Sequence, residues 1–414
     1  MARSLDVYLL GQFVGRLAQN VHGDMEFQYD LTWLDQEDAV ALSQSLPLRS
    51  EPFTRRECRG FFGGILPEGE NRGIIARNLG ISAANDLAML EAIGGECAGA
   101  VTFIPTGESL SPQAGHYQPL TDGQLAEILR KLPRRPLLAG EESVRLSLAG
   151  AQDKLAVHVT AGQILLPLNA APSSHILKPA IGRLEATVAN ELLCMSLAAA
   201  IGLPVPAAEV GRVEEIDYLL VERYDRPIGE DGNPMRLHQE DFCQALGIPS
   251  ETKYQDEGGP STQDCFQLLR SASSVPALDV ARLLDALIFN YLVGNCDAHG
   301  KNFSLLYRGS VNQTRTTTFA PLYDLVCTAY YPDLSRRMAM KIGGEFDPAK
   351  LYPRHFERLA EEAGLTQPMV RRRVPAMARA VKSKIAVVTP NHAVATAIAD
   401  IICGNCDRTL ERFR

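Results

Sequence analysis

The sequence predicts an α+β fold in which a small N-terminal α/β module precedes a strand-rich lobe and a largely helical C-terminal lobe. The first observation is a series of short apolar runs of strand type between residues 144 and 221. The second is helical spacing after Glu240, including a strongly apolar helix from Asp279 to Val293. A chain of 414 residues is long enough for about two to four domains. We therefore place the domains at residues 1–135, 136–226 and 227–414.

The N-terminal module mixes strand and helix patterns. Asp6 to Leu17 contains two apolar runs around Gly11-Gln12, which predicts a β-hairpin. After it we expect an alternating strand at Met25–Trp33 and two helical segments at Phe61–Gly69 and Ser82–Ile93. A short strand at Ala100–Ile104 and a turn-rich segment at Thr106–Gly115 follow. The last predicted element is a helix at Leu120–Leu132, which ends before a proline. This mixture indicates a small module of its own.

The segment after the module is rich in strands. The predicted strands lie within Val144–Val159, which holds two of them, and at Gln163–Leu168, His175–Lys178 and Tyr218–Val221. One helix is expected from Thr187 to Ile201, with Gly202 as its stop signal. Strands followed by helices is the order of the two lobes in protein-kinase-like folds. We therefore expect a two-lobed, protein-kinase-like architecture.

Composition and charge limit the classes of protein. A net charge of -8 argues against a broad nucleic-acid-binding surface, which needs clustered Lys and Arg. The N-terminus lacks the uninterrupted apolar region of a signal peptide, and no apolar run approaches the roughly 18 residues of a membrane span. Nine scattered cysteines fit free thiols in the cytoplasm. The C-x-x-C pair Cys403 and Cys406 has no second pair nearby, which favours buried thiols over a metal site.

The segment Asp297-Ala298-His299-Gly300-Lys301-Asn302 carries the strongest chemical signal. An Asp five residues before an Asn is the spacing of a kinase catalytic loop, where the carboxylate meets the attacking hydroxyl and the amide oxygen holds a metal ion. A second acid, Asp324, follows and would hold Mg²⁺ on the phosphates of ATP. We assign Asp297, His299 and Lys301 to catalysis and Asn302 and Asp324 to the metal. His299 has the alternative interpretation of an ordinary surface or core histidine.

A loop of small residues and a strand-end lysine suggest a phosphate site. Between two predicted strands, the candidate nucleotide-binding residues are Ala149, Gly150, Ala151, Gln152, Asp153 and Lys154. Small residues let backbone N–H groups approach phosphates, although one glycine also fits a simple hairpin turn. Lys178 ends an apolar strand, an unusual place for a charge unless it meets an anion. Glu191 or Glu185 would orient it, while Glu191 also fits a plain role at a helix N-terminus.

A candidate adenine-binding hinge follows the strand Tyr218–Val221. The apolar strand passes into the polar segment that contains Glu222 and Tyr224. Backbone groups in such a hinge contact the adenine edge, so the side chains are only loosely informative. The alternative is a strand end with surface ion pairs.

At these residues the chain resembles the HipA family of bacterial serine/threonine kinases, the toxin half of HipBA toxin–antitoxin modules. The resemblance covers nearly all of the chain and extends to the segments Phe61–Pro67, Gly99–Thr102, Ser147–Lys154, Lys253-Tyr254, Gly258–Pro260 and Ala339–Gly344. It implies that Asp297 is the catalytic base, that Asn302 and Asp324 bind Mg²⁺, and that Lys178 contacts ATP phosphates. It also implies that Glu222 and Tyr224 lie at the adenine hinge and that Ser147 is an autophosphorylation site.

The resemblance also implies partners. These are a HipB-like helix-turn-helix antitoxin, operator DNA reached through that antitoxin, and a protein substrate, with an aminoacyl-tRNA synthetase such as glutamyl-tRNA synthetase as a candidate. Two other readings of the catalytic residues stay open. One is a small-molecule or lipid kinase, because related loops occur in phosphoinositide kinases and aminoglycoside phosphotransferases. The other is a kinase-fold binding protein without activity, which the intact Lys178, Asp297, Asn302 and Asp324 disfavour.

Overall fold

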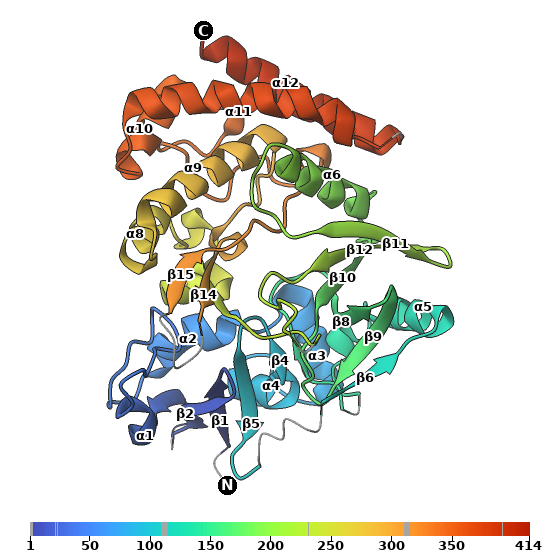
Figure 1. The fold of residues 1–414 in the computed structure, drawn as a ribbon, viewed down its shortest axis with the longest axis vertical. Helices are drawn as coiled ribbons and strands as arrows, with labels where there is room; N and C mark the ends of the chain where they lie inside the picture. Colours follow the sequence, from blue (N-terminus) through green and yellow to red (C-terminus); the bar gives the residue numbers. More distant parts are fainter. Residues whose placement is uncertain are drawn as a thin grey trace. The chain divides into compact units, whose positions relative to one another are not determined.

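The structure is a computed structural model and describes residues 3–20, 22, 24–108, 115–141, 143–230, 232–309, 315–390 and 392–414. The chain forms two compact units. The first consists of Met1–Pro179, Gly211–Glu251 and Leu306–Thr316, and the second of Ala180–Val210, Thr252–Leu305 and Thr317–Arg414. Helices and sheets are mixed throughout the described residues, which confirms the α+β class (Figure 1). The domain boundaries at residues 135 and 226 stay a prediction.

An antiparallel sheet opens the first unit. Its strand order is β3-β2-β1-β5, and the strands are β1 (Ser4–Leu9), β2 (Gln12–Gln19), β3 (Met25–Tyr29) and β5 (Val101–Pro105). The predicted hairpin is confirmed, because β1 and β2 pair through a turn in which Leu10 and Gly11 have positive φ. Residues Leu5, Val7 and Leu9 alternate with less buried neighbours, so one face of β1 packs into the core.

Helix-capping residues set boundaries that the sequence patterns misplaced. The strand predicted to reach Trp33 ends at Tyr29, because Asp30 caps the short helix α1 (Leu31–Leu34) through its side chain. The helix predicted from Phe61 instead begins at Arg55, where Thr54 and Glu57 form a capping box. The helices of this region are α2 (Arg55–Gly64), α3 (Gly69–Leu79), α4 (Asp86–Ile93) and α5 (Asp122–Lys131). Residues 109–114 of the predicted turn-rich segment lie outside the described residues.

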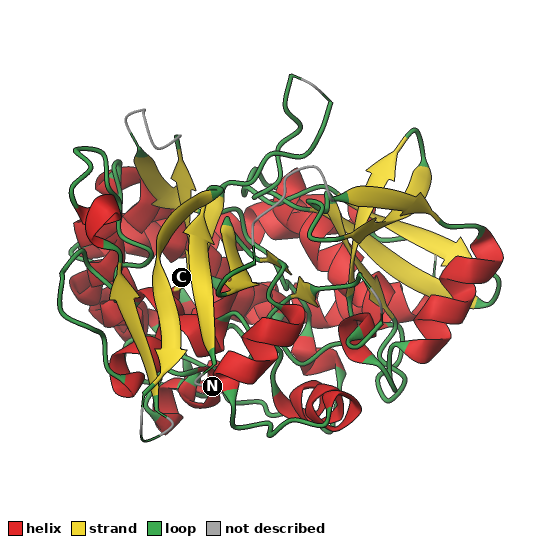
Figure 2. Cartoon of the chain, turned by 90° about the horizontal axis from the view of Figure 1, so that it is seen from below, coloured by secondary structure: helices red, strands yellow, loops and turns green. Residues whose placement is uncertain are grey.

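A second sheet of the first unit carries the predicted nucleotide-binding strands. Its order is β11-β12-β10-β8-β9-β6, from the strands β6 (His116–Pro119), β8 (Leu155–Thr160), β9 (Gln163–Leu168), β10 (His175–Pro179), β11 (Ala208–Val213) and β12 (Ile216–Glu222). The two sheets are separate groups of strands in Figure 2. A short parallel pair, β4 (Glu96–Cys97) with β7 (Leu146–Ser147), is additional to both. Strands β6, β11 and β13 (His238–Asp241) were not predicted.

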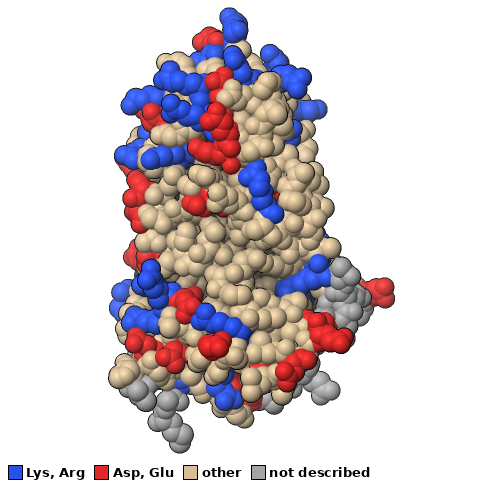
Figure 3. Space-filling model, turned by 90° about the vertical axis from the view of Figure 1, so that its left-hand side faces the viewer, with Lys and Arg blue, Asp and Glu red and all other residues tan. Residues whose placement is uncertain are grey.

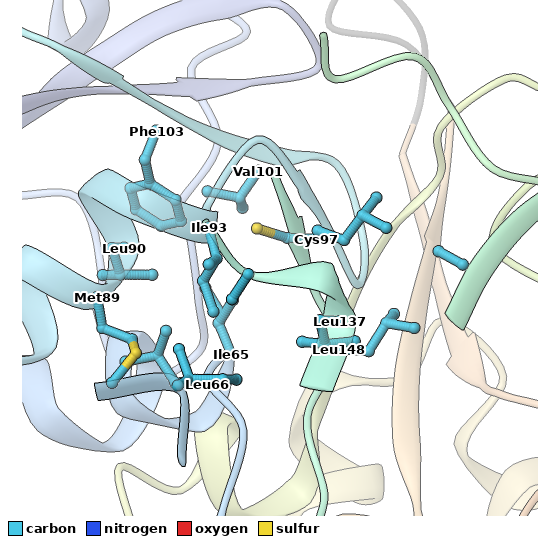
Figure 4. Packing of buried hydrophobic residues seen from close by; sticks show 14 of the residues in the cluster. Ile65, Leu66, Met89, Leu90, Ile93, Cys97, Val101, Phe103, Leu137 and Leu148 are labelled. Atoms are coloured by element: carbon cyan, nitrogen blue, oxygen red, sulfur yellow. The ribbon is translucent and has the colours of Figure 1, made fainter. Parts of the chain in front are cut away.

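One hydrophobic cluster links the N-terminal module to the residues around β7. It contains Phe103 and Val101 of β5 and Leu90 and Ile93 of α4, and it continues through Ile65, Leu66, Leu137 and Leu148 (Figure 4). Because these side chains are buried together, the module and the loop after β7 share one core.

The second unit is mainly helical. Its helices are α6 (Thr187–Ala200), α8 (Thr262–Ala272), α9 (Pro276–Val293), α10 (Pro353–Glu362), α11 (Gln367–Val388) and α12 (Ala393–Arg412). The predicted helix from Asp279 is confirmed and begins slightly earlier, at Pro276, where a proline fits the first turn. It ends at Gly294, whose φ of 74° closes the helix with bonds to Asn290 and Tyr291. Short elements complete the chain: α7 (Phe242–Ala245), β14 (Ser304–Arg308) and β15 (Thr316–Phe319).

Among the described residues, no helix is long and apolar enough to cross a membrane. All nine cysteines are free, and Cys406 is buried. In the same described part of the chain, no group of three or more His, Cys, Asp or Glu side chains could hold a metal ion.

A buried carboxyl group lies beside β13. The side chain of Glu240 accepts hydrogen bonds from the Ser43 and Tyr307 hydroxyls and, at 3.0 Å, from the backbone amide of Gln44. Burial raises the pKa of this carboxyl from 4.5 to about 7, although those hydrogen bonds oppose the shift. Glu240 thus takes up a proton on folding near neutral pH.

This pKa predicts a pH dependence of stability. Because the pKa of Glu240 is higher in the folded protein, this carboxyl contributes its full amount to the free energy of unfolding below about pH 4.5. The contribution is lost as pH rises through about 7, and its maximum is roughly 3 kcal/mol. Between pH 5 and pH 8, the melting temperature of the uncharged variant Glu240→Gln should therefore fall by less than that of the wild type. Differential scanning calorimetry at both pH values measures this, with the exposed Glu251→Gln as control. Parallel losses in all three proteins would contradict the assignment.

Candidate active site

The candidate catalytic-loop residues follow the C-terminus of α9 in the second unit. After Gly294, Asn295 accepts a hydrogen bond from the Asp297 amide at 3.2 Å and donates to Asn290 at 2.8 Å. The amide of Cys296 donates to the Thr328 hydroxyl at 2.8 Å. These bonds fix the backbone on both sides of Asp297, whose side chain is exposed. The loop thus presents one carboxylate from a rigid frame.

A tyrosine holds the Asp297 carboxylate. The Tyr254 hydroxyl donates to Asp297 Oδ1 at 2.7 Å, and the Tyr254 ring meets the His299 ring edge to face at 5.3 Å. The segment of Tyr254 is itself fixed, because Gln255 N donates to Ala339 O at 3.1 Å and Ala339 N donates to Cys296 O at 2.8 Å. Sequence reasoning assigned no role to Tyr254, although the motif Lys253-Tyr254 with Gly258-Gly259-Pro260 was part of the family resemblance.

Asn302 and Asp324 lie together in the second unit. Asn302 Nδ2 donates to Asp324 Oδ2 at 3.4 Å, while Asn302 Oδ1 accepts from the His299 amide at 3.0 Å. Asp324 has a φ of 53°, a left-handed backbone conformation that few non-glycine residues adopt and that Asp and Asn adopt more readily than most. One carboxylate and one amide oxygen fit Mg²⁺, which binds few protein ligands and keeps water and phosphate oxygens for the rest.

His299 and Lys301 are both buried beside this pair. The carbonyl of Lys301 accepts a hydrogen bond from Tyr323 at 2.7 Å, and the Tyr323 hydroxyl also meets Ser304 Oγ at 2.6 Å. The 3₁₀ turn Gly300–Asn302 thus connects the loop to the residue before Asp324. A catalytic role for either side chain stays a prediction.

The candidate phosphate loop belongs to the first unit. Ser147 at its start is fully buried in β7, and its hydroxyl donates to Ile65 O at 3.0 Å. Gly150 has a φ of 104°, which disfavours any side chain there, and Lys154 Nζ donates to Ala149 O at 2.6 Å. Gln152 Nε2 donates to Pro179 O at 3.4 Å. The residues predicted to bind nucleotide are therefore an ordered loop between β7 and β8.

Lys178 lies on β10, where it faces Leu219 of β12 in register and is buried. Its two candidate partners are in the other unit: Glu191 is buried in α6, while Glu185 is exposed and accepts a hydrogen bond from Tyr330 at 3.1 Å. Burial makes Glu191 the more constrained acid. Which acid pairs with Lys178 stays a prediction.

The hinge candidates end β12. Glu222 is exposed and pairs in register with His175 of β10, and the Tyr224 hydroxyl donates to the side chain of Gln239. The residues between and after them do not form surface ion pairs. Arg223, Asp225 and Arg226 instead enter a buried cluster of charges.

This charge cluster joins β4 to the residues after β12. Arg223 and Arg226 both bind Glu96 and Asp225, at distances of 2.8–3.1 Å, and Arg236 binds the second oxygen of Glu96. Burial alone would raise the pKa of Glu96, but Arg226, Arg236 and Arg223 lower it below its ordinary value. Burial and the neighbouring Arg223 lower the pKa of Arg226 to about 10. All of these groups are nevertheless charged at neutral pH.

Comparison with known proteins identifies relatives over nearly the whole chain. The models of the HipA N-terminal domain and the HipA-like C-terminal domain match residues 5–104 and 146–385. The protein Y4mE of Sinorhizobium fredii is 50% identical over 378 residues, which cover 90% of this chain and 88% of that protein. The serine/threonine-protein kinase toxin HipA of Shewanella oneidensis is 29% identical over 397 residues, which cover 93% of this chain and 89% of that protein.

A solved structure gives the same picture. The HipA chain in a complex of Shewanella oneidensis HipA, HipB and operator DNA superposes with a TM-score of 0.85 and 26% identity. The match covers 99% of this chain and 98% of that chain.

The charge cluster predicts a large loss of stability in Glu96→Gln. The substitution leaves the buried Arg223 and Arg226 with Asp225 as their remaining carboxylate and removes the ion pair of the half-buried Arg236, so the free energy of unfolding should fall by roughly 3–5 kcal/mol. Urea unfolding measures the change. The control is Glu91→Gln, whose carboxylate is partly exposed and lies 3.6 Å from Arg3, and it should change stability by less than about 1 kcal/mol. Equal losses in both variants would contradict the analysis.

Proposed function

The chain belongs to the HipA family of serine/threonine-protein kinase toxins, and we propose that it transfers the γ-phosphate of ATP to a serine or threonine of a protein substrate. The observation that carries this proposal is the exposed Asp297 carboxylate in a loop that also brings Asn302 to Asp324 at 3.4 Å. One acid for the attacking hydroxyl and two oxygen ligands for a metal are the minimum for phosphoryl transfer.

Each residue then has one role. The Asp297 carboxylate accepts the proton of the substrate hydroxyl, and Tyr254 keeps that carboxylate oriented through its own hydroxyl. Asn302 and Asp324 hold Mg²⁺, which offsets negative charge on the ATP phosphates when bound. Lys178 and the loop from Ala149 to Lys154 bind phosphates.

Further proposed roles concern the adenine and the remaining catalytic-loop residues. Glu222 and Tyr224 flank the adenine, and their segment is anchored by the buried Arg223 and Asp225. His299 and Lys301 support the catalytic loop from buried positions. The main competing hypothesis is a small-molecule or lipid kinase. Every observation that fits this hypothesis fits a protein kinase equally well.

Loss of the base should separate chemistry from nucleotide binding. Asp297→Asn should lower phosphoryl transfer by about 10²–10⁴-fold while leaving ATP affinity nearly unchanged, because Asp297 touches the hydroxyl rather than the nucleotide. Asp324→Ala should instead weaken binding of Mg-ATP, because it removes a metal ligand. Radiolabel transfer and isothermal titration calorimetry measure the two quantities, with the exposed Asp400→Asn as control. Normal turnover by Asp297→Asn would remove the proposed mechanism.

The partners are proposed from the relatives. The Shewanella oneidensis HipA structure contains HipB and operator DNA, which supports a HipB-like helix-turn-helix antitoxin and DNA contact through that antitoxin. On the face in Figure 3, Lys and Arg are interspersed with Asp and Glu, which suits weak DNA binding by the chain alone. A short helix-turn-helix protein encoded beside this chain would support the proposal. The proposed site of action is the cytoplasm, and an aminoacyl-tRNA synthetase is a candidate substrate.

We also propose that Ser147 is autophosphorylated and that its phosphate switches the kinase off. The hydroxyl is fully buried and bonded to Ile65 O, so a group with a charge of about -1.5 to -2 cannot occupy its position without moving the loop. Phosphate at the edge of the loop would also repel ATP.

Phosphorylated chain should therefore bind ATP at least about ten-fold more weakly than the unphosphorylated form, since like charges meet at one site. The two forms are separated by anion exchange and compared by calorimetry with Mg-ATP. Ser147→Ala is a poor substitute, because it also removes the bond to Ile65. Equal affinities of the two forms would eliminate the switch.

A further inference from the structure

The turn between α2 and α3 in the N-terminal module contacts the candidate phosphate loop at several points. Pro67 and Gly150 form a parallel β-bridge, and Glu68 N donates to Gly150 O at 3.2 Å. Two side chains add to this backbone contact. Asn71 Nδ2 donates to Ala151 O at 3.1 Å, and Ser147 Oγ donates to Ile65 O at 3.0 Å. All of these residues lie in the first unit.

Three successive carbonyl groups of the loop accept hydrogen bonds, two of them from the turn and one from Lys154 of the loop itself. Ala149 O accepts from Lys154 Nζ, Gly150 O from the Glu68 amide and Ala151 O from Asn71. In a trans peptide the C=O and the following N–H point in opposite directions. The amides of Ala151 and Gln152 therefore point away from the turn, and neither has an acceptor among the described residues.

Two successive outward N–H groups are what binding of a phosphate oxygen requires. The loop contains one glycine, Gly150, so its shape does not follow from glycine flexibility alone. The orientation of the Ala151 and Gln152 amides depends on two donors outside the loop, Glu68 N and Asn71 Nδ2.

Asn71 is the side chain best placed to enforce this orientation. It is 8% exposed and sits in the first turn of α3. Besides its bond to Ala151 O, Asn71 interacts with the Asp153 carboxyl; burial raises the pKa of Asp153, and the Asn71 hydrogen bond opposes that rise. The buried carboxamide of Asn71 thus holds the middle of the loop through a hydrogen bond.

The turn is itself immobilised by the core. Ile65 and Leu66 are buried in the same hydrophobic cluster as Leu148, the residue that enters the loop (Figure 4). A shift of the loop relative to the turn would open this packing as well as the hydrogen bonds.

We propose that the turn Ile65–Asn71 is the seat of the phosphate loop and that Asn71 is a positioning residue for ATP binding. The N-terminal module is then part of the nucleotide site rather than a separate appendage. The expected effect on nucleotide affinity rests on the proposed kinase function. The contact between the turn and the loop does not depend on that function.

The test compares two asparagines of the same helix. Asn71→Ala removes the donor to the loop, and Asn71→Asp keeps the shape but replaces the donor with an acceptor. Asn78→Ala is the matched control, because Asn78 also lies on α3 and donates its amide to a backbone carbonyl, Arg134 O, at 3.0 Å. Melting temperatures establish that all variants are folded.

Two measurements are made on each full-length variant. Hydrogen–deuterium exchange of residues 147–154 in the nucleotide-free protein should become faster in both Asn71 variants and stay unchanged in Asn78→Ala. Calorimetry with the magnesium complex of the non-hydrolysable analogue AMP-PNP should show affinity about 3- to 10-fold weaker in the Asn71 variants, since one hydrogen bond is lost. The apparent KM for ATP should rise by the same factor with little change in kcat.

Wild-type exchange in both Asn71 variants, or equal effects from Asn78→Ala, would overturn the inference. Absence of AMP-PNP binding by the wild-type chain would instead overturn the proposed function, and the exchange measurement would still decide whether the turn seats the loop.

Discussion

The buried charge cluster around Glu96 is the constraint on which the first unit depends. Glu96 and Asp225 are enclosed with Arg223 and Arg226, and the half-buried Arg236 also binds Glu96, so the enclosed carboxylates and guanidinium groups must find their partners inside the protein. The backbone is bound as well, because Gly99 N donates to Asp225 and Cys97 O accepts from both Arg223 and Arg226. Breaking any of these contacts leaves a charge without water or counter-charge, which makes the cluster intolerant of small shifts.

The charge cluster fixes the position of the candidate phosphate loop through the strands β4 and β7. Glu96 and Cys97 form β4, β4 pairs with β7, and β7 ends at Ser147, where the loop begins. On its other side, the cluster contains the residues that follow β12 and so fixes the segment of Glu222 and Tyr224. A single set of ion pairs therefore anchors both the candidate phosphate loop and the candidate adenine-binding residues Glu222 and Tyr224. The N-terminal module adds a second anchor through Ile65, Glu68 and Asn71.

The second unit positions its candidate catalytic residues with hydrogen bonds rather than with buried ion pairs. Gly294 ends α9, and the bonds of Asn295 and Cys296 hold the backbone from which Asp297 projects. Tyr254 then orients the exposed carboxylate without burying it. This division suits the proposed role of Asp297, since a general base that exchanges a proton with substrate needs a fixed direction and an open face. The left-handed conformation of Asp324 is a local strain that the surrounding bonds maintain.

The sequence by itself predicted the α+β class, most strands and the helices α4, α5, α6 and α9, and it singled out the candidate residues of the catalytic loop. Apolar periodicity and stop signals such as Gly202 act over a few residues, so they can be recognised without the fold. Motif spacing likewise pointed to Asp297, Asn302 and Asp324, of which Asn302 and Asp324 lie in hydrogen-bond contact. Only the tertiary structure decided that Arg223, Asp225 and Arg226 are buried, that Tyr254 holds Asp297, and that Asn71 holds the loop. Those contacts join residues 43, 80 and about 127 positions apart, and no local pattern of side chains specifies which distant partners meet.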